Sequence, residues 1–165
     1  MAIRTVFGSL KQFEKGGIQI IRDDPGNYAF SNVFEVASRA RPWEKVAVAR
    51  NMEYVLEAVR AEGTSPWYAA AHDEFALVMD GAVEVTLRQL EESARVPAGT
   101  RGTTLLAGEP RGAAMGRIMA RRGHLSLLPV GAGYQLRAAE PSVLLLQTIL
   151  GAQTVERWAD ICITA

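Results

Sequence analysis

Two strand-like segments joined by an Asp-Gly pair place the strongest constraint on how this chain folds. Residues 74–79 are apolar at every position after Glu74, residues 83–87 carry apolar side chains at every second position, and Asp80-Gly81 stands between the two segments. Such alternation is typical of half-buried strands, and Asp-Gly favours a tight turn because both residues tolerate a positive φ. The pattern predicts a β-hairpin within a mainly β fold.

Further short segments extend this pattern along the chain. Residues 51–62 fit both helical and strand spacing, and the surrounding strands favour a strand there. Short strands separated by Gly and Pro turns predict an all-β sandwich or small barrel, in a single domain covering residues 1–165. The other expected strands are 18–21, 33–37, 44–49, 115–120, 125–128, 134–137 and 143–149.

Helices are expected only near the two ends. Ser9 begins a segment with Gln12 three residues later and Gly16 as a stop signal, which predicts a short N-terminal helix over 9–16. Near the other end, apolar residues at helical spacing predict a C-terminal helix packed through one face. These residues are Val155, Trp158, Ile161 and Cys162.

Residues 89–114 interrupt the succession of strands. Three Pro and Gly clusters fall there, with few large apolar residues. A structureless loop of that length is unusual in a compact domain, which favours a functional role or an interaction arm.

Composition excludes several classes of protein. The 18 basic and 18 acidic residues cancel, whereas proteins that read duplex DNA usually carry a basic excess. The longest uncharged stretch, 141–155, is too short and too polar for a membrane helix, and the first residues lack a secretory signal, so we expect a cytoplasmic protein. Cys162 is the only cysteine, which rules out an internal disulfide and favours a buried, inert thiol.

Two blocks of the chain resemble the paired signature of the cupin superfamily, whose members are small jelly-roll barrels. Gly123, five residues, Pro129, one residue and Gly131 match the second block, G-x5-P-x-G. The family places a metal-binding histidine three residues later, where this chain has Tyr134. Glu74 matches the glutamate of the first block.

The metal-ligand set of a cupin is incomplete in this chain. The two histidine positions of the first block fall within residues 67–71, which contain no histidine, so only Glu74 of the usual three His and one Glu is retained. We therefore expect neither a metal site nor a catalytic residue here, and His72, Glu74 and Tyr134 form a vestigial pocket. His72 either starts a two-ligand site with Glu74 or is a hydrogen-bonded loop residue, and His124 is expected on the surface.

Four longer segments resemble a narrower group, the small subunit of two-component hydroquinone 1,2-dioxygenases, and the similarity runs nearly end to end. This resemblance implies an Fe(II)-dependent enzyme that opens hydroquinone with O2 to 4-hydroxymuconic semialdehyde in aromatic catabolism. It also implies that the iron belongs to a larger cupin subunit, which pairs with this chain in an α2β2 heterotetramer. The segments are 28–35, 65–68, 72–77 and 154–159.

In this interpretation the chain supports the larger subunit and is inactive alone. Trp43, Trp67, Tyr68 and the arm 89–114 are candidates for the subunit interface, since aromatic residues are enriched in interface cores. Trp67 fits a core position equally well, and Trp158 is expected to close the C-terminal helix onto the barrel.

Two alternatives remain open from the residues. The chain could be a stand-alone cupin that binds a small polar ligand through His72, Glu74 and Tyr134. It could also be a metal-independent isomerase, with His72 as the base and Tyr134 as the acid.

Overall fold

The computed structural model describes residues 8–14 and 32–157, and nine strands make up most of them. Within these residues one α-helix, α1 (Val33–Arg39), and one 3-10 turn, η2 (Glu92–Ala94), accompany the sheet. The strands are β1 (Lys45–Asn51), β2 (Tyr54–Ala70), β3 (Glu74–Asp80), β4 (Ala82–Gln89), β5 (Thr103–Leu105), β6 (Ala114–Arg121), β7 (Leu125–Leu128), β8 (Ala132–Ile149) and β9 (Thr154–Val155).

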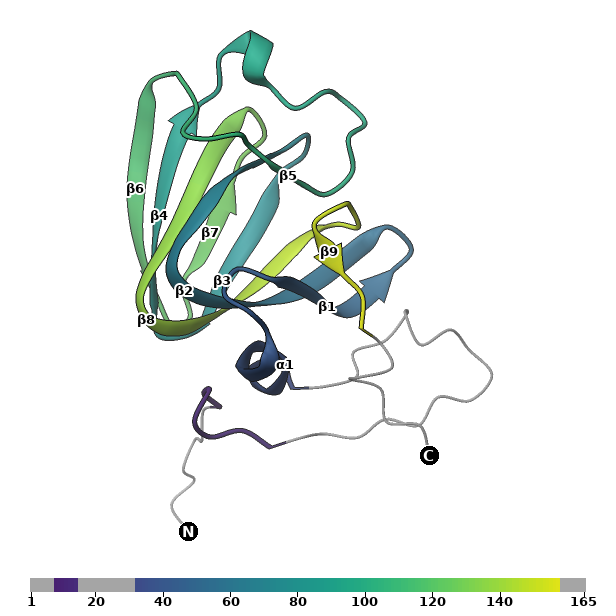
Figure 1. The fold of residues 1–165 in the computed structure, drawn as a ribbon, viewed down its shortest axis with the longest axis vertical. Coiled ribbons are helices and arrows are strands. Elements are labelled where there is room, and N and C mark those ends of the chain that lie inside the picture. Colours follow the sequence, from purple (N-terminus) through teal and green to yellow (C-terminus); the bar gives the residue numbers. More distant parts are fainter. Residues whose placement is uncertain (1–7, 15–31, 158–165) are drawn as a thin grey trace.

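The long strands β2 and β8 run antiparallel along almost their whole length and organise the barrel (Figure 1). Their register shifts twice, between Ala61 and Gly63 and between Thr64 and Trp67. On one side of these shifts β8 pairs with β3, which pairs in turn with β7; on the other side β8 pairs with β4, which pairs with β6. Each long strand therefore belongs to both walls of the barrel, as expected for the cupin jelly roll.

The Asp80-Gly81 turn joins these two walls. The flanking segments are strands, as predicted, but they do not pair with each other: β3 pairs with β8 over 143–147, and β4 pairs with β8 over 132–137. The predicted hairpin is therefore wrong, and the turn is a corner. Gly81 has φ +78, and a Cβ there would lie 2.1 Å from Ser142 Oγ, so glycine is required both by conformation and by space.

Residues 33–39 form helix α1 instead of the predicted strand. The Asn32 side chain caps the helix by accepting a hydrogen bond from Phe34 N at 2.9 Å. Val36 packs with Val46 and Val48 on the outer surface of β1, so the apolar residues that resembled a strand instead cover one. Local capping and this packing outweigh the short alternating pattern.

The predicted N-terminal helix over 9–16 is also wrong in its described part. Ser9 and Gln12 exchange two backbone hydrogen bonds in a tight turn, of 2.7 and 3.2 Å. Leu10 and Phe13 pack with Phe34 on the outside of the barrel. The predicted strand 18–21 lies outside the described residues.

The chain's last described element is a strand. Val155 lies in β9, which pairs in parallel with β1, so it is not helical. The remaining positions of the predicted C-terminal helix, Trp158, Ile161 and Cys162, lie outside the described residues.

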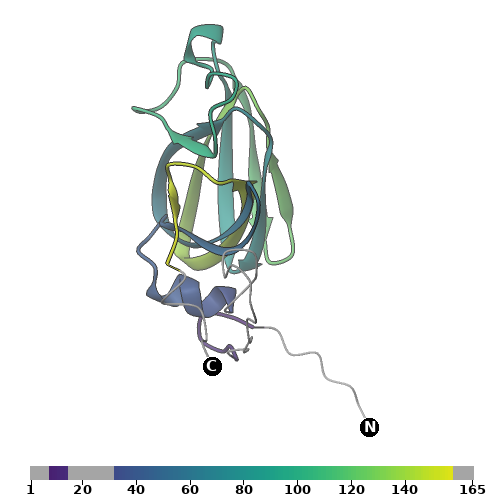
Figure 2. The same cartoon turned by 90° about the vertical axis from the view of Figure 1, so that its right-hand side faces the viewer.

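The arm 89–114 covers one end of the barrel, opposite α1 (Figures 1 and 2). It contains η2 and the short strand β5, which pairs with the end of β2.

Strands β6 and β7 match the predicted segments closely, whereas the predicted strands 134–137 and 143–149 are parts of the single strand β8. No helix in the described part of the chain is long and apolar enough to span a membrane.

Candidate functional site

A cluster of buried polar side chains lies inside the barrel. Glu74 begins β3, Thr103 begins β5, and Tyr134 and Thr148 lie on the two halves of β8. All four are at most 3% exposed. Side chains alternate between the two faces of a strand, so residues from four strand positions converge on the interior.

Three hydroxyl groups donate hydrogen bonds to the carboxylate of Glu74. Thr103 Oγ1 and Thr148 Oγ1 both donate to Oε1, and the Tyr134 hydroxyl donates to Oε2, each at 2.6 Å. Distances this short are typical of hydrogen bonds to an ionised acceptor. Glu74 thereby connects β3 to β5 and to both halves of β8.

His72 extends this network toward the surface. It lies half-buried between β2 and β3, and its Nε2 is 3.0 Å from Thr148 Oγ1. Because Thr148 uses its single proton toward Glu74, its oxygen accepts the bond and His72 Nε2 is the donor. His124 is exposed, as predicted, and its Nδ1 lies 3.0 Å from Arg121 N.

Two further charged residues lie in the interior, and the sequence did not single them out. Lys45 on β1 is 3% exposed and Glu57 on β2 is 1% exposed. The Lys45 ammonium lies 4.3 Å from the centre of the Tyr68 ring and 6.0 Å from that of Tyr134. Glu57 Oε2 is buried without a hydrogen-bond partner.

Burial shifts the proton affinities of these groups. Desolvation lowers the pKa of Lys45, and the carboxylates of Glu57 and Glu74 partly oppose that change. Desolvation raises the pKa of Glu57, while Lys45 partly opposes it. The pKa of Tyr134 is raised well above its usual value by burial and by the adjacent Glu74 charge, so the phenol remains a hydrogen-bond donor.

This donor set does not fit the metal ion that cupins commonly bind. No group of three or more His, Cys, Asp or Glu residues in the described ranges is placed to hold a metal. Glu74 is the one carboxylate at the expected position, and both of its oxygens already accept hydrogen bonds. A neutral tyrosine replaces the histidine at 134, and first-row metals require imidazole or carboxylate ligands that converge.

The vestigial pocket is also closed to a small ligand. Glu74 and Tyr134 are 0% and 1% exposed and bond to each other. His72 contacts Thr148, not Tyr134, so the base and acid of the isomerase alternative do not face a common space. These contacts favour neither alternative function.

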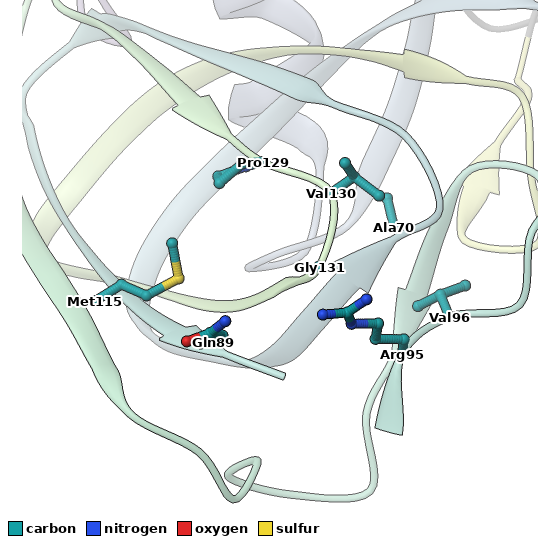
Figure 3. Close-up of a pocket in the computed structure, with 8 residues that line it drawn as sticks. All are labelled: Ala70, Gln89, Arg95, Val96, Met115, Pro129, Val130 and Gly131. Carbon is teal, nitrogen blue, oxygen red and sulfur yellow. The ribbon is translucent and has the colours of Figure 1, made fainter. Parts of the chain in front are cut away.

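A separate cavity of about 440 Å³ lies at the barrel end covered by the arm (Figure 3). Arg95 and Val96 of the arm line it together with Val130 and Gly131 of the G-x5-P-x-G turn. None of the buried polar residues described above is among its lining residues. The cavity is thus distinct from the polar cluster.

The aromatic residues predicted for a subunit interface lie mostly inside this chain. Trp67 and Tyr68 are 7% and 4% exposed. Trp43 is half-buried against the barrel core, and its indole Nε1 has no hydrogen-bond partner. Little of the Trp67 and Tyr68 side chains is therefore available to a second subunit.

One signal in the sequence could have revealed the missed residues. Lys45 precedes a Val-Ala-Val-Ala run, and Glu57 lies between Leu56 and Ala58, so each is a charge within an apolar strand. Charges in such positions are seldom buried unless they are paired. Without the strand pairing, however, the faces they occupy could not be assigned.

Fold comparison first defines the class of protein. The chain superposes on a cupin-2 domain protein from Shewanella frigidimarina NCIMB 400 with a TM-score of 0.51 and 17% identity, over 70% of this chain and 89% of that one. That similarity shows the fold, a cupin barrel. No protein-family model matches the chain, and no curated protein does.

Two solved structures then define the family. Hydroquinone 1,2-dioxygenase from Sphingomonas sp. TTNP3 with 4-hydroxybenzoate bound is 53% identical, with a TM-score of 0.90 over 99% of both chains. Hydroquinone 1,2-dioxygenase PnpCD in complex with Cd2+ and 4-hydroxybenzonitrile is 50% identical, with a TM-score of 0.89 over 99% of this chain and 98% of that one. The chain belongs to the hydroquinone 1,2-dioxygenase family.

A longer chain with the same fold also matches. In PnpCD with Fe3+, the alignment spans 81% of this chain but only 36% of that one, at 13% identity and a TM-score of 0.59. That chain is therefore more than twice as long as this one.

Proposed function

We propose that this chain is the iron-free accessory subunit of an Fe(II)-dependent hydroquinone 1,2-dioxygenase. The observation that carries the proposal is the hydrogen bonding of Glu74, the one retained cupin ligand. Hydroxyl groups inside the barrel donate hydrogen bonds to both of its carboxylate oxygens. Family membership supplies the reaction, which opens hydroquinone with O2 to 4-hydroxymuconic semialdehyde.

The two chain lengths among the matched dioxygenase structures support a division of labour. One kind of chain aligns with this one from end to end, and another is more than twice as long. In our proposal the longer kind is the partner and bears the iron. The two form an α2β2 heterotetramer that acts in cytoplasmic breakdown of aromatic compounds.

This chain then acts by holding its partner's site rigid. Its contribution is mechanical, because the Glu74 network joins both walls of the barrel and makes this subunit a stiff support. We do not assign it a proton-transfer or substrate-binding step.

An apolar strip on β3 and β7 is the surface that we expect the larger subunit to cover. Phe75 pairs with Leu127 and Leu77 pairs with Leu125, and all four side chains lie on the outer face. Phe75, Leu127 and Leu125 are 38%, 44% and 63% exposed. Interfaces between permanent subunits are large and apolar, which matches this strip better than the buried Trp67 and Tyr68.

Separation of the subunits tests the accessory role. The full-length chain, expressed alone and exposed to Fe(II), should retain no stoichiometric iron and consume no O2 with hydroquinone. The same chain co-expressed with the larger subunit should restore O2 uptake and product absorbance. Ring cleavage by this chain alone would refute the proposal.

The location of the interface has its own test. Leu125→Glu and Leu127→Glu should abolish co-purification with the larger subunit and leave the unfolding temperature of this chain unchanged. Met52→Glu is the control, because Met52 is 82% exposed on the distant β1–β2 turn. Normal co-purification of both leucine variants would place the interface elsewhere.

A further inference from the structure

The barrel buries negative charge at the position where other cupins place a metal. Glu74 on β3 is 0% exposed, and Glu57 on β2 is 1% exposed. An isolated carboxylate is very unfavourable in such a setting unless a cation or a proton neutralises it. A positive partner in the interior would therefore stabilise these two groups.

Lys45 is placed to be that partner. It pairs with Val59 across β1 and β2, and Val59 belongs to the barrel core, so the lysine side chain points inward. Glu57 pairs with Ala47, two residues further along β1, and therefore faces the same interior. Both Glu57 and Glu74 act electrostatically on the Lys45 ammonium.

Two aromatic rings complete the surroundings of the ammonium. The Tyr68 and Tyr134 rings lie 5.8 Å apart, and the ammonium lies 4.3 Å from the first and 6.0 Å from the second. A cation over an aromatic face is attracted by the ring, more strongly when water is excluded. The hydroxyl of Tyr134 simultaneously donates to Glu74, so one residue contacts both charges.

We propose that the ammonium of Lys45 takes the place of the metal ion in this barrel. It is a cation built into the chain, placed over the Tyr68 and Tyr134 rings and within the electrostatic influence of Glu57 and Glu74. Through the Tyr134 ring it connects β1 with the residue whose hydroxyl donates to Glu74.

The charges around the ammonium are opposite in sign to its own. One ammonium shares the interior with two carboxyl groups; desolvation raises the pKa of Glu57, and the charge of Lys45 partly opposes that rise. The inference concerns the same barrel as the proposed function but does not depend on it. The chain could carry this cation whether or not it serves a larger subunit.

Removal of the ammonium should convert the barrel into a site for an added cation. Lys45→Ala should lower the unfolding temperature of the full-length chain by roughly 6–20 °C, since it leaves a buried charge unpaired. Methylammonium or ethylammonium chloride should restore much of that loss, and Zn2+ or Mn2+ should do so in part. The same salts should leave the wild-type unfolding temperature unchanged.

Two variants separate charge from packing. Lys45→Met keeps the side-chain stem but removes the charge, so it should be destabilised as well; wild-type stability in this variant would overturn the inference. Lys11→Ala is the matched control, because Lys11 is exposed and its loss should change nothing. Destabilisation of Lys45→Ala that none of these cations reverses would also overturn it.

A measurement on the unmodified chain covers the case in which the variants do not fold. The chain has three lysines, so reductive methylation followed by peptide mass spectrometry resolves each one. Lys45 should react at least about 100-fold more slowly than Lys11, because it becomes accessible only through opening of the barrel. Equal rates would refute the buried ammonium. Failure here would leave the iron and O2-uptake tests of the proposed function untouched.

Discussion

Replacement of Tyr134 by phenylalanine tests the Glu74 network with a minimal change. The variant keeps the ring and removes one of the three hydroxyl groups that donate to the carboxylate. A hydrogen bond to a charged acceptor contributes roughly 1.5–3 kcal/mol. For a chain of this size each kcal/mol corresponds to about 2–4 °C, so the unfolding temperature should fall by roughly 3–12 °C.

Urea unfolding followed by circular dichroism is the appropriate assay. The midpoint should fall while the m-value stays the same, because the variant changes stability and not the surface exposed on unfolding. Tyr54→Phe is the control, since Tyr54 is 56% exposed, and it should remain within about 0.5 kcal/mol of the wild type.

The pH dependence of this effect has a definite sign. The pKa of Tyr134 in the folded chain is raised well above its usual value, so the folded state retains the proton longer than the unfolded state. Wild-type stability should therefore decline as pH rises above about 10, and the difference from Tyr134→Phe should shrink. Equal stability of the two proteins at neutral pH would refute the network argument.

Three further outcomes follow from single positions. Glu57→Gln should gain stability relative to the wild type as pH rises above 4.5. The pKa of Glu57 is raised in the folded chain, so the folded wild type holds a proton that the unfolded chain releases. Urea unfolding midpoints measured across pH test this. Gly81→Ala should destabilise more than Gly99→Ala in thermal unfolding, since both have a positive φ but only Gly81 would place its Cβ against Ser142. Asn32→Ala should lose about 0.5–2 kcal/mol through the lost helix cap, and Asn32→Asp should retain it, as calorimetry can show.

The strands were predictable where short apolar segments lay between turn residues. The segments 74–79, 83–87, 115–120 and 125–128 are strands within a residue or two of the predicted limits. The segment 33–37 was wrongly predicted as a strand, because five residues are too few to distinguish a strand from one turn of an amphipathic helix. Its outcome depended on the Asn32 cap and on packing against β1.

Sequence motifs also identified Glu74 and Tyr134 as successors of cupin ligands. They could not indicate that the two side chains bond to each other, nor that Thr103 and Thr148 share the same carboxylate. Threonine is common in strands for its branched side chain, so nothing in the pattern singles out these two.

The sequence by itself determined the fold class, the family resemblance and the loss of histidines at the metal-ligand positions, since each depends only on residue identity and spacing. Tertiary structure alone decided that Asp80-Gly81 is a corner and that Lys45, Glu57 and Glu74 are all buried in the interior. Those outcomes depend on which strands pair, and in what register. Register decides whether a side chain faces water or the interior, and a charge in the interior must find its partner among residues distant in the chain.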